Sequence, residues 1–346
     1  MRRAVMGVNS ARDVAERMGN DGAMHPARRI VVGLGVGAGL PLAAGSIALA
    51  HGDEATAPTL AIILTTWTGD PLPWIGIAVA TVAYLVAVRI VNRHHPTNRV
   101  SGWRTAAWLG GVAAIAIALL SAVDVYAGSL FSVHMVQHLL LAMVAPPLLA
   151  LGAPVTLMLR VATPGVRRRA LLPFLHSRLV KAVSWPPLGW AIFAAVMWAT
   201  HFSPLFNAAL DNEALHFAEH LLYLVAGALF WWPVVGADPI RWRLSPVGRM
   251  VYLASQMPFN TAVGLAIYFA PAVLYPHYAA LTRTWGPDTF TDQQVAGITM
   301  WGIGDVILLG ALVLAAAAWL RADEKRSRRA REQAARKIER ASIESG

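Results

Sequence analysis

Eight apolar segments, each about as long as a bilayer-spanning helix, constrain what this chain can fold into. A helix needs about 20 predominantly apolar residues to cross a hydrocarbon core about 30 Å thick. Only 14% of the 346 residues are charged and 56% are hydrophobic, so a soluble domain of this size is excluded. The sequence predicts an all-α fold, a polytopic membrane helix bundle, from apolar segments at roughly 28–50, 71–91, 104–123, 130–153, 186–201, 214–236, 249–270 and 294–320.

The first apolar segment differs from the others in its composition and in the residues at its end. It is rich in Gly and Ala, comes after a pair of arginines, and ends in "SIALAHGDE" with an A-x-A site before His51. These features are typical of a cleaved signal peptide, and an uncleaved signal anchor is the alternative. Seven transmembrane helices then remain. We expect three parts: an N-terminal basic region with the signal peptide or signal anchor (1–50), a seven-helix membrane domain (51–320) and a basic cytoplasmic tail (321–346).

The basic residues predict how the chain is oriented in the membrane. Of the 29 Lys and Arg, only Arg283 lies in a connection on the opposite side from the rest. Because cytoplasmic connections of membrane proteins carry the excess of Lys and Arg, we expect a multi-pass protein of the bacterial cytoplasmic membrane with its C-terminus in the cytoplasm. The net charge of +10 then faces anionic membrane lipid, and no nucleic-acid partner is expected.

The absence of cysteine limits the chemistry of any site. Disulfides, thiolate zinc sites, iron–sulfur clusters and cysteine nucleophiles are excluded, because the chain has no cysteine. A metal would have to be bound by histidine, methionine, carboxylate or backbone oxygen atoms.

Two histidine pairs lie at the outer ends of two predicted helices. His134 and His138 are spaced i, i+4, as are His216 and His220, so each pair shares one helix face. Met135 and Met300 are expected nearby, and imidazole and thioether together suit copper, Cu(I) especially. The pattern predicts a metal site on the outer side; the alternative is that these rings bond backbone carbonyls or water.

Two further features of the apolar segments have predicted consequences. Asp305 lies about 16 Å into the last helix with no basic residue at that depth, which makes it a functional candidate. It is predicted to orient a ligand histidine or to carry a proton, unless it is protonated and hydrogen-bonded between helices. Pro146 and Pro147 are expected to bend their helix and to free backbone carbonyl groups.

Four stretches of the sequence resemble the CtaG family of bacterial cytochrome c oxidase assembly proteins. They are "FSVHMVQHLLLAMVAPPLLALGAP" (131–154), "MWATHFSPLFNAALDNEALHFAEHLLYLVAGALFWWPVVGADP" (197–239), "LYPHYAAL" (274–281) and "DQQVAGITMWGIGD" (292–305). The resemblance implies a membrane assembly factor for haem–copper cytochrome c oxidase. It also implies that the protein is no enzyme but a copper chaperone, which delivers copper to the copper-containing subunits of the oxidase. The motif histidines are His134, His138, His216 and His220.

Other functions remain open from the residues alone. "HFAEH" (216–220) matches the H-x-x-E-H motif of an intramembrane zinc metalloprotease, with Glu219 as general base and Asp292 or Asp305 as third ligand. A copper permease and a haem b protein with two histidine ligands are further alternatives. A retinal protein is excluded, because the three lysines all lie in expected cytoplasmic segments.

Overall fold

The structure is a computed structural model that describes residues 56–239 and 241–344, with side chains as far as Gln333. The predicted signal peptide or anchor and the cleavage site before His51 lie outside the described residues. Within them the chain is helical, and one isolated β-bridge joins Trp67 to Ser121.

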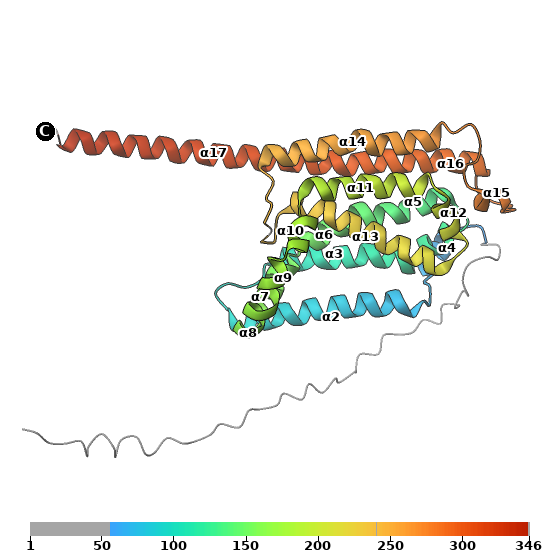
Figure 1. Ribbon diagram of the computed structural model, residues 1–346, viewed down its shortest axis with the longest axis horizontal. Helices are drawn as coiled ribbons and strands as arrows, with labels where there is room; N and C mark the ends of the chain where they lie inside the picture. The colour runs from blue at the N-terminus through green and yellow to red at the C-terminus, as the bar shows by residue number, and fades with distance from the viewer. Residues whose placement is uncertain (1–55, 240, 345–346) are drawn as a thin grey trace, which may run out of the picture. The chain divides into compact units, whose positions relative to one another are not determined.

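The long helices run side by side in a bundle (Figure 1). Each of the seven spans predicted after His51 overlaps one of them. Two are interrupted by a π-helical turn but continue beyond it. The long elements are α2 (Pro71–His94), α3 (Gly102–Leu120), α5 (Phe131–Leu139) with η1 (Leu140–Val144) and α6 (Ala145–Leu151), α11 (Pro186–His201), α13 (Glu213–Val235), α14 (Pro246–Tyr268), and α16 (Thr289–Ile298) with η3 (Thr299–Ile303) and α17 (Gly304–Glu344).

The described part of the chain is a multi-pass membrane protein. Five of its helical segments are long and apolar enough to cross a membrane, and a sixth qualifies if α11 and α12 (Pro204–Leu210), bent by 70°, form one span. The helix α14 is 23 residues long but has a lower apolar content, since it carries Arg249, Gln256 and Asn260. The predicted count of seven spans therefore stays a prediction.

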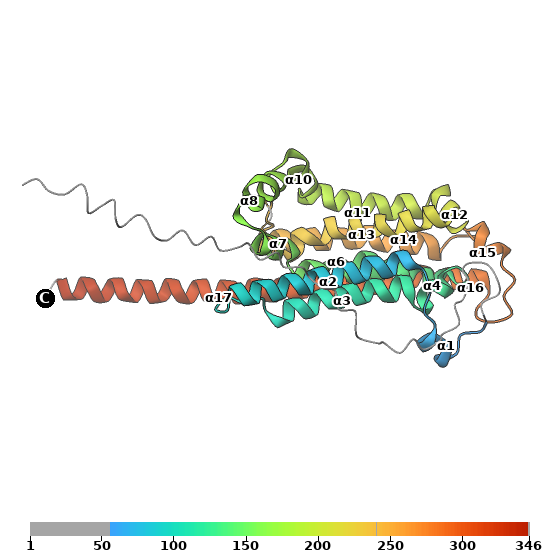
Figure 2. The same cartoon turned by 90° about the horizontal axis from the view of Figure 1, so that it is seen from below.

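Short helices lie at the two ends of the bundle (Figures 1 and 2). One end, which we call the histidine end, holds α1 (Leu60–Thr65), α4 (Ala122–Ala127), α12 and α15 (Pro276–Ala280). The other, the basic end, holds α7 (Pro154–Val161), α8 (Pro164–Val166), η2 (Arg167–Leu171), α9 (Leu172–Leu175) and α10 (Arg178–Val183).

The apolar core lies between α5, η1, α11, α13, α14 and α17, while α2 packs at the periphery of the bundle. Phe193, Phe230, Tyr223 and Leu253 are among the fully buried core side chains. By contrast, α2 exposes a stripe of apolar side chains at three- and four-residue intervals, as expected of a helix that faces lipid: Leu72, Ile75, Val79, Val82 and Val86.

Pro146 and Pro147 free a backbone carbonyl of their helix, as predicted, while the predicted bend stays a prediction. Neither has an N–H group, so the carbonyl of Ala142 has no helical donor four or five residues ahead. The indole Nε1 of Trp231, on α13, donates to this carbonyl at 3.2 Å. The two prolines come directly after the π-helical turn η1. The freed carbonyl thus joins the helix of the first histidine pair to the helix of the second.

A cysteine-labelling experiment tests the predicted orientation. We expect that a Gly165→Cys variant, at the basic end, reacts with a membrane-impermeant thiol reagent only after the cells are lysed. A Thr284→Cys variant, at the histidine end, should react in intact cells. Both positions are exposed, and the native chain contributes no cysteine background. The opposite labelling pattern would show that the basic end faces outward.

Candidate metal centre

The two histidine pairs lie together because α5 and α13 run side by side. The ring centroids of His134 and His138 are 4.3 Å apart, and those of His216 and His220 are 4.2 Å apart, so each pair shares a face as predicted. Across the two helices, the centroids of His134 and His216 are 5.3 Å apart. His134, His138 and His220 are buried, whereas His216 is partly exposed.

Glycine at position 227 allows this close approach of the helices. A Cβ atom on Gly227 would lie 2.5 Å from the carbonyl oxygen of Ala142, a distance that no side chain tolerates. A residue without a side chain is therefore required where α13 crosses η1. About two turns earlier on α13, Glu219 and His220 face the α5 histidines.

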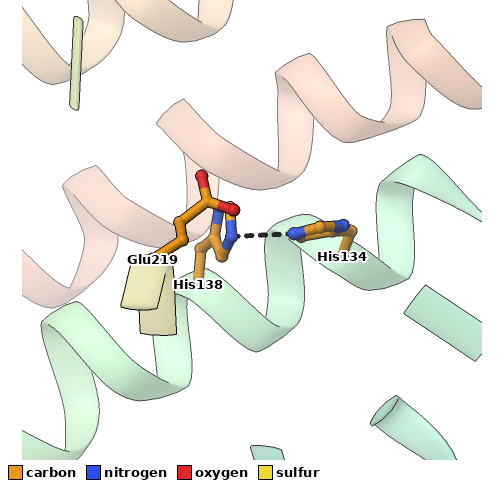
Figure 3. A group of neighbouring side chains, drawn as sticks. All are labelled: His134, His138 and Glu219. Carbon is orange, nitrogen blue, oxygen red and sulfur yellow. Dashed lines mark hydrogen bonds between the residues drawn. The ribbon is translucent and has the colours of Figure 1, made fainter. Parts of the chain in front are cut away.

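Glu219 completes a group of three candidate ligands with His134 and His138 (Figure 3). One nitrogen of each ring and one carboxylate oxygen all lie within 4.8 Å of one another. Glu219 is 4% exposed, and neither of its oxygens accepts a hydrogen bond from the described residues. A buried carboxylate without a donor is costly, and a bound cation would remove that cost.

Tyr278 fixes the tautomer of His134. The Tyr278 hydroxyl donates to the carbonyl of Ala127 at 2.8 Å, so its oxygen must accept from Nδ1–H of His134 at 2.9 Å. The lone pair of His134 is then on Nε2, which lies 2.8 Å from Nε2 of His138. The Nε2–H of His138 donates to this lone pair. Both Nε2 atoms are thereby directed toward the same point, as in a metal site whose ligands are oriented by outer hydrogen bonds.

Asp292 holds the start of the histidine helix α5. Its carboxylate accepts from the backbone N–H of Phe131 at 2.7 Å and from the N–H and hydroxyl of Ser132 at 3.4 and 2.5 Å. Asp292 is 1% exposed and belongs to α16. An acidic side chain at a helix N-terminus satisfies free N–H groups and complements the helix dipole. The register of His134 and His138 is therefore set from a helix more than 150 residues away in sequence.

The carboxylates proposed as a third zinc ligand have other partners. Both oxygens of Asp292 are used at the start of α5. Asp305 accepts from Nδ2 of Asn260 at 3.0 Å and from the hydroxyl of Thr261, so its observed partners lie on α14 and neither is a histidine. This contact matches the alternative of an aspartate hydrogen-bonded between helices. A role for Asp305 in metal binding stays a prediction.

The two methionines named with the histidines lie in the apolar core. Met135 is fully buried and Met300, in the π-helical turn η3, is 2% exposed. Both belong to the main core cluster. That they contribute sulfur ligands stays a prediction.

Three residues at this site were not assigned to it from the sequence: Glu219 as a ligand, Tyr278 and His201. The ring of His201 lies 5.7 Å from that of His138, its Nδ1 donates to the carbonyl of Met197 at 2.7 Å, and its buried Nε2 has no partner among the described residues. A cavity of about 640 Å³ at the histidine end is bordered by His201, Asp211 and Tyr275. The ring of His201, one of the walls of this cavity, lies beside that of His138.

The sequence profile described as "Cytochrome c oxidase caa3 assembly factor (Caa3_CtaG)" matches residues 82–322. This range contains α5, α13 and every candidate ligand. The chain belongs to this family. The chain is a multi-pass membrane member of this family.

Mycobacterial proteins are similar to this family member over most of its length. Uncharacterized proteins of Mycobacterium bovis and Mycobacterium tuberculosis are each 32% identical to it over 278 residues, and one of Mycobacterium leprae is 29% identical over 279 residues. Each alignment covers 78% of this chain but 41% of the relative, so the chain spans about two fifths of the length of these proteins. No solved structure matches it.

Asp124, at the histidine end of this family member, predicts a pH dependence of stability. Burial raises the pKa of Asp124 to about 7, against the hydrogen bond from Gln137, which lowers it. A carboxyl group with a raised pKa stabilises the fold below its ordinary pKa near 4, and that stability is lost as the pH rises to about 7. We expect Asp124→Asn, which keeps the acceptor oxygen for Gln137, to unfold at a higher temperature than the wild type above pH 7.

The control for this prediction is Asp323→Asn, which removes an exposed carboxylate of α17. Thermal unfolding of the purified proteins between pH 4 and pH 8 should show a smaller pH dependence for Asp124→Asn alone. An unchanged pH dependence in that variant would mean that Asp124 is ionised throughout.

Proposed function

We propose that this protein helps to assemble haem–copper cytochrome c oxidase by holding copper at His134, His138 and Glu219 and passing it to a copper-containing subunit. Membership of the assembly-factor family supports the first part. The second part is carried by one observation: a buried carboxylate with no donor among the described residues lies within 4.8 Å of two imidazole nitrogens. This arrangement is unfavourable without a cation and favourable with one.

The donor atoms suit copper as cargo. Two imidazole nitrogens and one carboxylate oxygen bind Cu²⁺ more tightly than other divalent first-row metals. The sequence pattern alone favoured Cu(I), for which thioether sulfur is a good ligand. The carboxylate shifts this preference toward Cu(II), while the neighbouring rings of His201 and His216 offer ligands for either oxidation state.

The site is closed, which would keep competing ligands away from a bound copper ion. It must therefore open before copper can be passed on. Tyr275 and Tyr278 lie over it from the segment around α15, and their hydroxyls donate to backbone carbonyls of His201 and Ala127. Displacement of this segment toward the adjacent cavity would expose His138 and His201. In the proposed orientation, this end faces the outside of the bacterial cytoplasmic membrane, where copper arrives, and the C-terminus is cytoplasmic.

The geometry favours a holding site over the zinc protease. In the protease, Glu219 would stay off the metal and activate water between His216 and His220. Here Glu219 groups instead with His134 and His138, and both oxygens of Asp292 accept hydrogen bonds at the start of α5. We therefore propose that the protein is not an enzyme.

The experiment compares oxidase in strains that carry wild-type, His134→Ala or His138→Ala protein at equal levels. We expect the variants to leave an oxidase that contains haem but lacks copper and activity, with partial rescue by added copper through mass action. The combined variant should lose less oxidase copper and activity than the two single losses added together, because both histidines serve one site. His94→Ala, an exposed histidine at the basic end, is the matched control.

Two outcomes would overturn the proposal. Normal oxidase copper in the combined variant under copper limitation would leave only a scaffold role. Time-dependent copper uptake into vesicles that contain the purified protein would favour the permease.

A further inference from the structure

A second cavity, of about 450 Å³, lies at the basic end of the bundle and does not touch the metal centre. Its walls are the connection between α2 and α3, the first turn of α3 and the start of α7. Three arginines line it: Arg99, Arg104 and Arg160. Ser101 and Thr156 add hydroxyl groups to the same lining. We call this the arginine pocket.

The charge of the arginine pocket is not balanced within the described part of the chain. No carboxylate there lies within ion-pair distance of any of the three guanidinium groups. Arg104 and Arg160 are half-buried, which makes unbalanced charge unfavourable. Arg160 donates one bond to the carbonyl of Asn98 and Arg99 donates one to that of Pro96. Each guanidinium has five N–H donors, so most of their donors stay available for an anion.

The walls of the pocket are fixed by buried polar contacts. Asp238, 1% exposed, accepts from the backbone N–H of Val155 and from the N–H and hydroxyl of Thr156, the last two at 2.7 Å. Tyr84 donates to the carbonyl of Gly152 at 2.8 Å. These bonds set the direction of the first turn of α7, which places Thr156 and Arg160, one turn apart, beside the pocket. The backbone that forms the walls of the pocket is therefore held in place before any anion binds.

The surroundings identify the anion. Trp103 is 53% exposed beside the pocket, with the Arg104 guanidinium 5.7 Å from its ring centroid, and tryptophan is enriched where a membrane meets water. The apolar stripe of α2 ends at Val86, about two turns before the connection that forms the pocket. We propose that the arginine pocket binds the phosphodiester of an anionic glycerophospholipid, with Arg104 and Arg160 as the main donors. Arginine pairs with phosphate through two parallel bonds, and the acyl chains would lie along α2 and α3.

Native mass spectrometry of the whole protein in detergent tests this proposal. The probes are phosphatidylglycerol, phosphatidylcholine and inorganic phosphate. We expect the wild type to retain phosphatidylglycerol in preference to phosphatidylcholine. The double variant Arg104→Gln, Arg160→Gln should bind it about 30-fold more weakly, since each arginine near an anionic lipid contributes about a factor of five. Arg168→Gln, Arg169→Gln, exposed arginines of η2 at the same end, is the matched control and should bind normally.

Each remaining outcome decides the question. Equal retention by both double variants, or equal retention of the two lipids by the wild type, would overturn the proposal. Displacement of phosphatidylglycerol by millimolar inorganic phosphate would assign the pocket to a soluble anion instead. If the glutamine variant does not fold, Arg104→Lys, Arg160→Lys keeps the charge but loses the paired geometry, and intermediate affinity is expected. Copper binding should be unchanged in every folded variant, so this test is independent of the proposed function.

Discussion

Glu219→Gln is expected to weaken copper binding at least ~100-fold and, in the same protein, to stabilise the metal-free fold. Loss of a group that only orients a metal ligand costs 10–100-fold in affinity, so loss of a charged ligand should cost at least the upper figure. The metal-free fold is expected to become more stable because Glu219 is buried. Without metal, the carboxylate of Glu219 has no donor among the described residues, and a neutral amide is less costly to bury.

Copper binding would be measured by competition with a chelator of known affinity, and stability by thermal unfolding with and without copper. Glu213→Gln, an exposed acid in the first turn of the same helix, should change neither quantity appreciably. If Glu219→Gln binds copper as tightly as the wild type, Glu219 is not a ligand. If it destabilises the metal-free protein, the carboxylate has a structural partner and the argument from its missing donor fails.

Asp292→Ala is expected to destabilise the protein by about 3–5 kcal/mol, because two buried N–H groups lose their acceptor. These are the N–H groups of Phe131 and Ser132 at the start of α5. The unfolding midpoint should fall by roughly 10 °C. Copper affinity should fall as well, although Asp292 touches no candidate ligand, because α5 carries His134 and His138 three and seven residues beyond Phe131.

The Asn variant separates the causes of this effect. Asp292→Asn keeps one acceptor oxygen, so we expect it to recover part of the stability and most of the copper affinity. Asp288→Ala, which removes the exposed N-cap of α16, should have a smaller effect on stability and none on copper. A normal unfolding midpoint for Asp292→Ala would show that water replaces the carboxylate at the start of α5.

Several features of the site could be predicted from local sequence. The i, i+4 spacing of His134 and His138 places both rings on one face of any helix that contains them, whatever that helix packs against. The same holds for His216 and His220. Likewise, two consecutive prolines must leave a carbonyl without its helical donor, and the structure shows that carbonyl on Ala142.

Other features depend on which helices meet. In "HFAEH" the sequence suggests that Glu219 is a catalytic base, because it lies next to His216 and His220. The sequence does not show that Glu219 also packs against α5. From the sequence, Asp292 is a candidate third metal ligand. The structure shows instead that it accepts hydrogen bonds from Phe131 and Ser132. Asp305 was expected near the histidines, yet its observed partners are Asn260 and Thr261, since η3 and α17 pack on α14.

The sequence by itself determined the membrane class, the positions of the long helices and the two histidine pairs, because hydropathy and helical periodicity act over a few turns of one chain segment. Only the tertiary structure decided that Glu219 joins His134 and His138, that Tyr278 sets the tautomer of His134, and that three arginines share one pocket. These contacts join residues that lie far apart in the sequence, 144 positions in the case of His134 and Tyr278. The contact of Glu219 with the α5 histidines also depends on how closely α13 approaches η1, which Gly227 allows.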